Sequence, residues 1–146
     1  MAASRVVVIK ASRPWTAGGT ADRAVMARMY ARGLALVTGE TDNARAVSSL
    51  FGSGDRVGIK VNTIGGRALS TGPDVALPLA DHLSRNGLQE KNVFVWDRTT
   101  RELRDAGYAV NAGRSGVRVF GTDAAGVGYG SDLVSHLDVG SLFSNI

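Results

Sequence analysis

Cysteine is absent from the 146 residues of this chain, and histidine occurs only twice, at His82 and His136. The sequence therefore excludes disulfide bonds, thiolate nucleophiles, zinc–cysteine sites and cysteine-ligated iron–sulfur clusters within this chain. Two histidines also exclude a histidine-rich metal centre, and the identity of any cofactor stays open. No run approaches the roughly eighteen apolar residues that a membrane-spanning helix needs, so we expect no membrane partner.

Charge of neither sign dominates strongly. Lys and Arg number 17 against 13 Asp and Glu, which gives a net charge of +4. The cations are scattered from Arg5 to Arg118, and several lie beside an acidic residue, as Arg23 lies beside Asp22. A nucleic-acid-binding protein usually gathers its cations along one stripe. The pattern favours a solvated surface of mixed charge over a nucleic-acid interface.

The N-terminus shows no secretion signal, because Met1 is followed within four residues by a strand-like run at residues 5–10 that is too short for the apolar part of such a signal. As written, the chain is expected to stay in the cytoplasm. A mature, exported periplasmic protein whose leader had been removed would look the same.

Glycine is plentiful, with 19 residues, and turns separate short patterned segments. Runs rich in Val, Ile and Phe predict four buried parallel strands, at residues 5–10, 56–62, 92–97 and 117–122. Helical patterns lie between and after them, at residues 22–37, 42–51, 71–86 and 100–106, with a further short helix at 131–137. Thr20 or Asp22 could cap the first of these helices, and Gly39 is expected to stop it. This alternation predicts one α/β domain over residues 1–146, with a mainly parallel, Rossmann-like sheet of four or five strands and helices on both faces.

The third of these helices carries two local signals of its own. Thr71 and Asp74 have the spacing of a capping box at its start. Pro78 is expected to kink the helix or to shorten its first turns, because proline lacks the backbone N–H.

Polar residues gather where the predicted strands end, which is where open α/β sheets bind ligands. A glycine-containing loop at residues 63–71 then leads into a helix N-terminus, a position that favours anions. We therefore expect a small anionic or oxygen-rich ligand. The candidate ligand-binding residues are Lys60, Asn62, Gly65, Gly66, Arg67, Thr71, Asp97 and Asp123.

Each candidate also has a structural interpretation. Lys60 could be ion-paired, Asn62 could complete a turn, and Asp97 and Asp123 could cap the helices that follow them. Two other functions stay open. In an enzyme, Lys60 would be a general base or electrostatic stabiliser oriented by Asp97, or the aspartates would hold a hard metal. In a non-catalytic interaction module, an open sheet edge would pair with another chain.

Several stretches together resemble the N-terminal half of the family called domain of unknown function 362. The most specific is GDRVGIKVN at residues 54–62, followed by STGPD at 70–74 and NVFVWDR at 92–98. The resemblance covers roughly residues 5 to 146. It implies an architecture that continues into another strand and a second half, so that part of the ligand cleft would lie outside this chain. Some family members carry twin-arginine export signals or ferredoxin-like cysteine motifs, and this sequence has neither.

The end of the chain predicts self-association. A parallel sheet that stops there leaves an unpaired edge, and residues 139–146 include the apolar Leu142, Phe143 and Ile146 with no later element to cover them. We expect a homo-oligomer, with a homodimer as its simplest form.

Overall fold

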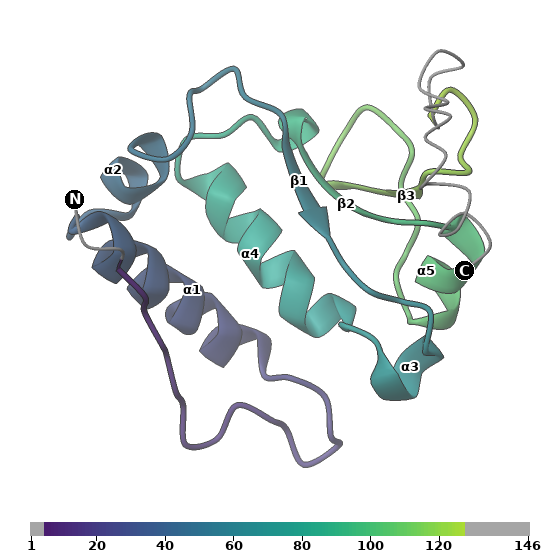
Figure 1. Cartoon of the computed structure of the whole chain (residues 1–146), viewed down its shortest axis with the longest axis horizontal. Coiled ribbons are helices and arrows are strands. Elements are labelled where there is room, and N and C mark those ends of the chain that lie inside the picture. The colour runs from purple at the N-terminus through teal and green to yellow at the C-terminus, as the bar shows by residue number, and fades with distance from the viewer. Residues whose placement is uncertain (1–4, 128–146) are drawn as a thin grey trace, which may run out of the picture.

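The structure is a computed structural model and describes residues 5–127. Its elements follow one another as shown in Figure 1: α1 (Arg23–Thr38), α2 (Asn43–Ser48), β1 (Val57–Lys60), α3 (Gly66–Leu69), α4 (Pro73–Arg85), the short 3-10 helix η1 (Glu90–Asn92), β2 (Val93–Asp97), α5 (Thr100–Asp105) and β3 (Arg118–Gly121). The α/β class is confirmed. The expected helix at 131–137 and the apolar tail at 139–146 lie outside the described residues.

The strands form one parallel sheet in the order β1-β2-β3, which confirms three of the four predicted strands with shorter bounds. The register places Lys60 opposite Trp96, and Trp96 opposite Phe120. When strand order follows chain order, right-handed crossovers place all connecting helices on the same face of the sheet. Accordingly, α4 and α5 both contribute to the core on one face, and helices on the second face are not seen in residues 5–127.

The predicted strand at residues 5–10 is wrong. This segment is extended, but it lies alongside α1 without joining the sheet (Figure 1). Arg5 donates a hydrogen bond to the Leu36 carbonyl at 3.1 Å, and Ile9 packs close to Gly33. Alternate residues of the segment face solvent, with Val6 85% and Val8 72% exposed. A short apolar run predicts burial, but it does not distinguish burial within a sheet from burial against a helix. A fourth or fifth strand and a Rossmann-like arrangement are therefore not seen among the described residues.

Helix α1 has the ends that its sequence predicts. The Asp22 carboxylate accepts hydrogen bonds from the amides of Ala24 and Val25, and Gly39 ends the helix with φ 81°. These are the usual devices for satisfying the unpaired groups at helix ends.

Helix α4 departs from its prediction in two respects. The capping box at Thr71 is wrong, because Gly72 is the N-cap and no side chain caps it, while Asp74 accepts a hydrogen bond from the Ala21 amide instead. The helix also runs through Pro78 without being shortened, and the proline ring is buried in the protein. Burial of the ring offsets part of what the missing backbone hydrogen bond costs.

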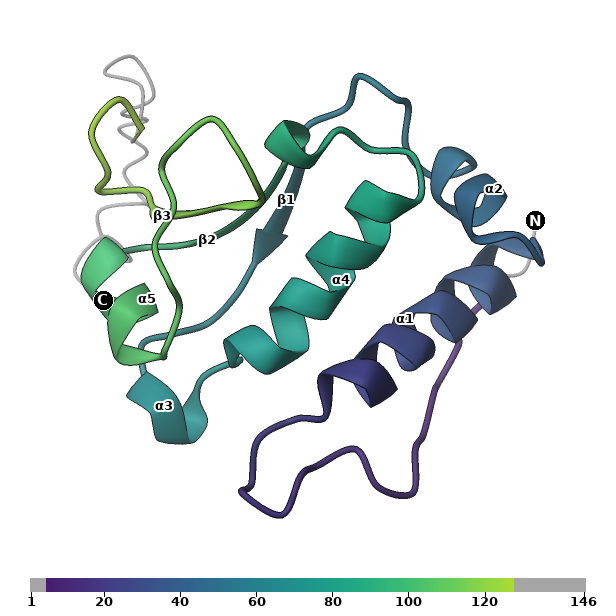
Figure 2. The same cartoon turned by 180° about the vertical axis from the view of Figure 1, so that it is seen from behind.

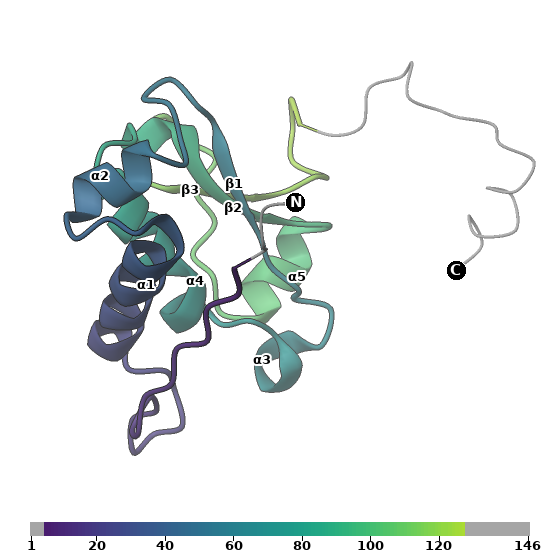
Figure 3. The same ribbon diagram turned by 60° about the vertical axis from the view of Figure 1, so that its left-hand side comes forward.

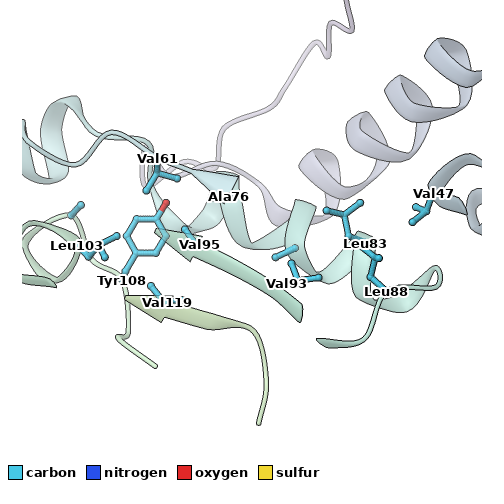
Figure 4. Close-up of a cluster of buried hydrophobic side chains, with 12 residues drawn as sticks. Val47, Val61, Ala76, Leu83, Leu88, Val93, Val95, Leu103, Tyr108 and Val119 are labelled. Atoms are coloured by element: carbon cyan, nitrogen blue, oxygen red, sulfur yellow. The ribbon is translucent and has the colours of Figure 1, made fainter. Parts of the chain in front are cut away.

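The core lies between the sheet and helices α4 and α5. Figure 4 shows Val93, Val95 and Val119 from the strands meeting Leu83 and Leu103 from the helices. Helix α1 packs on the outer side of α4. The sheet therefore forms one layer, α4 lies in the middle layer, and α1 forms the outer layer (Figures 2 and 3). None of the helices in this described part is both long and apolar enough to cross a membrane.

Candidate functional site

An ion pair joins the ends of β1 and β2. The Nζ atom of Lys60 lies 2.6 Å from Oδ1 of Asp97 and also donates to the Val61 carbonyl at 2.6 Å. The other carboxylate oxygen, Oδ2, accepts from the Thr63 amide at 2.7 Å and from the Thr63 hydroxyl at 2.5 Å. The Asp97 side chain is 7% exposed and that of Lys60 is 51% exposed. The ion-pair interpretation of Lys60 is confirmed.

These contacts determine the protonation of Asp97. Burial raises the pKa of its carboxyl group, but the hydrogen bonds from Lys60 and Thr63 outweigh burial and lower the pKa to about 2. A carboxylate this acidic is a weak proton acceptor at neutral pH. Both of its oxygens are already engaged, so a metal ion would have to displace Lys60 or Thr63. No group of three or more potential metal-ligating side chains occurs in the described residues.

The loop after β1 is more folded than a simple glycine loop. The side-chain oxygen of Asn62 accepts from the Ile64 amide at 3.3 Å, while its backbone carbonyl accepts from the Thr71 amide at 3.1 Å. Asn62 therefore completes a turn. Gly65 precedes the four-residue helix α3, which was not predicted, and Gly66 begins that helix with φ 60°, a conformation that favours glycine.

Asp123 serves the start of α5. Its Oδ1 accepts hydrogen bonds from the amide and the hydroxyl of Thr100, both at 2.7 Å, and these bonds lower the pKa of the Asp123 carboxyl group. Asp123 is expected to cap the helix that follows it, and that expected helix at 131–137 lies outside the described residues. Asp123 instead bonds to the start of α5, the helix that precedes it.

A cleft of about 1190 Å³ opens beside the N-terminal ends of α1 and α4, close to α3. Two of the predicted residues, Arg67 and Thr71, line it. The walls also include Ser70, Arg23 and Asp74, which the sequence analysis did not select as ligand-binding residues. The loop before α1 closes one side of this cleft, and no local sequence signal predicts that contact.

Arg67 is the cation in this cleft that has no counterion. Its guanidinium group lies against Gly107, and no salt bridge or hydrogen bond holds it within residues 5–127. The Ser70 hydroxyl is buried nearby without a hydrogen-bond partner. By contrast, Asp22 and Asp74 already accept hydrogen bonds from backbone amides. The cleft therefore offers a ligand one unpaired positive charge and unused hydroxyl groups.

Tyr108 bonds to the loop that lines the cleft. Its hydroxyl donates to the Thr71 carbonyl at 2.7 Å, and burial raises the pKa of that hydroxyl above its ordinary value. Because Tyr108 belongs to the core cluster, this bond connects the core to the loop that carries Thr71. Such a bond holds a lining residue in place in the absence of ligand.

Comparisons with protein-family models, with curated proteins and with solved structures each found no match for this chain. The resemblance to domain of unknown function 362 therefore remains a prediction from sequence motifs. In the structure, the motif at residues 54–62 contains β1 and the motif at 92–98 contains β2. Their conspicuous residues, Lys60 and Asp97, are the two that form the ion pair.

The predicted site residues therefore do not all lie in one place. Arg67 and Thr71 line the cleft, whereas Lys60 and Asp97 bind each other. The remaining candidates form turns, caps or helix starts.

Proposed function

We propose that this domain binds a small anionic ligand in the cleft beside the N-terminal ends of α1 and α4. One observation carries the proposal: Arg67 lines a cleft of about 1190 Å³ and has no counterion within residues 5–127. An arginine presents a planar fork of N–H donors that suits carboxylate and phosphate oxygens. A cleft of this size is ample for a small organic molecule.

The polar groups around Arg67 restrict the ligand further. Ser70 and Thr71 supply hydroxyl groups, and the Ser70 hydroxyl lacks a partner in the protein. Asp22 and Asp74 also line the cleft and disfavour a ligand of high negative charge. The ligand that fits best is a monophosphate or a carboxylate whose other end carries hydroxyl groups, because the aspartates accept hydrogen bonds from hydroxyls.

The test is a titration of inorganic phosphate and of acetate followed by NMR of the backbone amides. We expect saturable shifts confined to residues 64–72, together with the amides near Gly107. Arg67→Met keeps most of the stem length and removes the charge, and we expect it to weaken phosphate binding by about tenfold, the effect of losing one charge-assisted hydrogen-bonded pair.

Arg85→Met is the matched control, since it removes the same charge from an exposed arginine at the C-terminal end of α4, and Arg85 does not line the cleft. It should leave the binding unchanged. Equal weakening by both variants, or an absence of shifts at millimolar phosphate, would contradict the proposal.

As a second candidate, we propose that the domain is an interaction module that associates with a second copy of itself. The second face of the sheet supports this proposal, because Phe94 and Trp96 lie there partly exposed and no helix of residues 5–127 covers them. Strand β1 is also an edge strand among the described strands. Apolar faces and open edges of this kind favour association.

Sedimentation over a concentration series tests this candidate. We expect the apparent mass to rise towards that of a dimer. A single monomeric species at high concentration, unchanged by deletion of residues 139–146, would contradict it.

We also propose that the domain is the N-terminal half of an architecture like that of domain of unknown function 362. In this proposal, the sheet reaches four or five strands in a Rossmann-like order, and helices cover its second face. The exposed aromatic side chains on that face support it, since covered faces are the rule in parallel sheets. An experimental structure tests it directly: a strand added beside β1 or β3 is the expected result, and a three-stranded sheet would contradict it.

A further inference from the structure

A groove of about 450 Å³ runs between the extended N-terminal segment and the outer face of α1. Figure 1 shows this segment, in purple, beside the helix. The groove is separate from the cleft and shares no lining residue with it. We call it the basic groove, after the four cationic residues that line it: Lys10, Arg13, Arg28 and Arg32.

The lining of the basic groove carries charge of one sign only. Besides the four cations, it consists of apolar residues and one serine, and it includes no acidic residue. All four cations are exposed, and none of them takes part in a salt bridge within residues 5–127. Two arginines of the described residues do form salt bridges, Arg23 with Asp81 and Arg98 with Glu102. An unpaired group of like charges is electrostatically unfavourable until an anion binds to it.

The fold holds these cations opposite one another. Arg28 and Arg32 lie one turn apart on α1, so their side chains leave the same face of the helix. The segment that carries Lys10 and Arg13 is fastened at both ends. Before the groove, Arg5 bonds to the Leu36 carbonyl; after it, the Asp22 amide donates to the Pro14 carbonyl at 2.8 Å.

The segment packs against α1 at Gly33. A Cβ atom at this position would lie 3.6 Å from the Ile9 side chain, which is an ordinary contact distance. The groove is therefore part of the folded structure and does not depend on the chance positions of long side chains.

We propose that the basic groove binds an oligophosphate, that is, a ligand with two or three linked phosphate groups. Four cations match the charge of such a ligand, and arginine forks bind phosphate oxygens in pairs. The volume of the groove lies near the lower end of small-molecule sites, which suits a phosphate chain. No aromatic side chain lines the groove, so nothing there would stack on a base. The phosphate chain is therefore the part of the ligand that this groove recognises.

Isothermal titration calorimetry with sodium tripolyphosphate, pyrophosphate and orthophosphate tests the proposal. We expect affinity to increase with the number of phosphates and to fall with added salt. The double variant Arg28→Met/Arg32→Met should bind tripolyphosphate at least about tenfold more weakly, because two charge-assisted contacts are lost. Lys10→Met, on the other side of the groove, should also weaken tripolyphosphate binding. Because this change lies outside α1, it controls for a folding defect in the double variant of that helix.

The matched control is Arg101→Met/Arg104→Met, which removes the same charge from two exposed arginines of α5. It should keep the full affinity for tripolyphosphate. Arg67→Met, in the cleft, should also keep it, which separates this proposal from the function proposed above. Equal weakening by the two double variants would overturn the proposal, because overall charge would then explain the binding. Tight binding of oligo(dT) without measurable binding of tripolyphosphate would overturn it too, and would point to nucleic acid as the partner.

Discussion

The ammonium group of Lys60 lies 2.6 Å from Oδ1 of Asp97, although the two residues are 37 positions apart in the sequence. Strand register brings them together, since β1 and β2 are neighbours and both residues stand at strand ends. The lysine is half exposed and the aspartate is buried. This difference in exposure determines how much each side chain contributes to the stability of the folded protein.

Replacing the two partners should have unequal effects on stability. Asp97→Ala leaves the Thr63 amide and hydroxyl without their acceptor in a buried position, and we expect it to lower the free energy of unfolding by about 3 kcal/mol. Lys60→Met should cost only about 1 kcal/mol, because the lysine is half exposed to solvent. Urea unfolding of both variants measures these values.

The same Lys60 variant tests whether Lys60 binds ligand or has only a structural role. Lys60 does not line the cleft, so Lys60→Met should bind phosphate as the original protein does. Lost binding with an unchanged melting temperature would instead assign Lys60 a direct role in the site.

Stability should fall in acid through Asp97. The pKa of this carboxyl group is about 2 in the folded protein against 3.8 in the unfolded chain, so the unfolded state takes up the proton first as the pH falls. The stabilisation is complete above about pH 4 and is lost as the pH falls towards 2, and it amounts to on the order of 2 kcal/mol.

Unfolding free energies measured between pH 5 and pH 2 test this expectation. Other carboxylates contribute in the same direction, so the comparison is with Asp97→Asn, whose pH dependence should be shallower by the amount assigned to Asp97. Parallel curves for the two proteins would show that Asp97 is not responsible.

Glycine at position 121 is required by a close approach of the backbone. A Cβ atom there would collide with the backbone nitrogen of Thr100 and would lie 2.5 Å from the carbonyl carbon of Thr99. Gly121→Ala should therefore destabilise the protein by about 2 kcal/mol or more, since β3 and the start of α5 must separate. Gly54→Ala is the control, because nothing lies within 4 Å of its Cβ position, and it should change stability by less than about 0.5 kcal/mol. Equal denaturation midpoints for the two variants would contradict the predicted contact.

Removing the Tyr108 hydroxyl should loosen the cleft. Tyr108→Phe takes away the donor to the Thr71 carbonyl, and we expect a loss of about 1 kcal/mol in stability. Hydrogen exchange should become faster at the Thr71 amide, and phosphate binding should weaken. Tyr30→Phe is the control: its hydroxyl donates to the Val75 carbonyl at 3.0 Å, so stability should fall similarly without faster exchange at Thr71. The same exchange at Thr71 in both variants would show that Tyr108 does not hold the loop.

Local sequence signals were sufficient to predict the helices and strands that depend only on nearby residues. Asp22 and Gly39 predicted the limits of α1, and the Val-rich runs predicted β1 and β2. These signals succeed because a helix cap or a buried strand depends on residues within a few positions of one another. The α/β class followed from the same signals, since alternating strands and helices have few ways to pack.

The prediction was wrong where a segment had more than one partner available. Residues 5–10 have the apolar run of a buried strand, but they pack along α1. Thr71 has the spacing of a capping box, but its loop bonds to Asn62 and Tyr108, and Asp74 bonds to Ala21. Each of these choices depends on which distant element offers the better contact, and sequence spacing does not contain that information.

In the candidate site, too, the sequence predicted some features and distant contacts determined others. The sequence alone determined which residues carry polar chemistry at strand ends, namely Lys60, Asp97, Arg67 and Thr71. Only the tertiary structure decided that the first two neutralise each other and that the last two line an open cleft. The reason is physical: a charged side chain is free for a ligand only when no opposite charge lies within a few ångströms, and strand register and loop packing determine that distance.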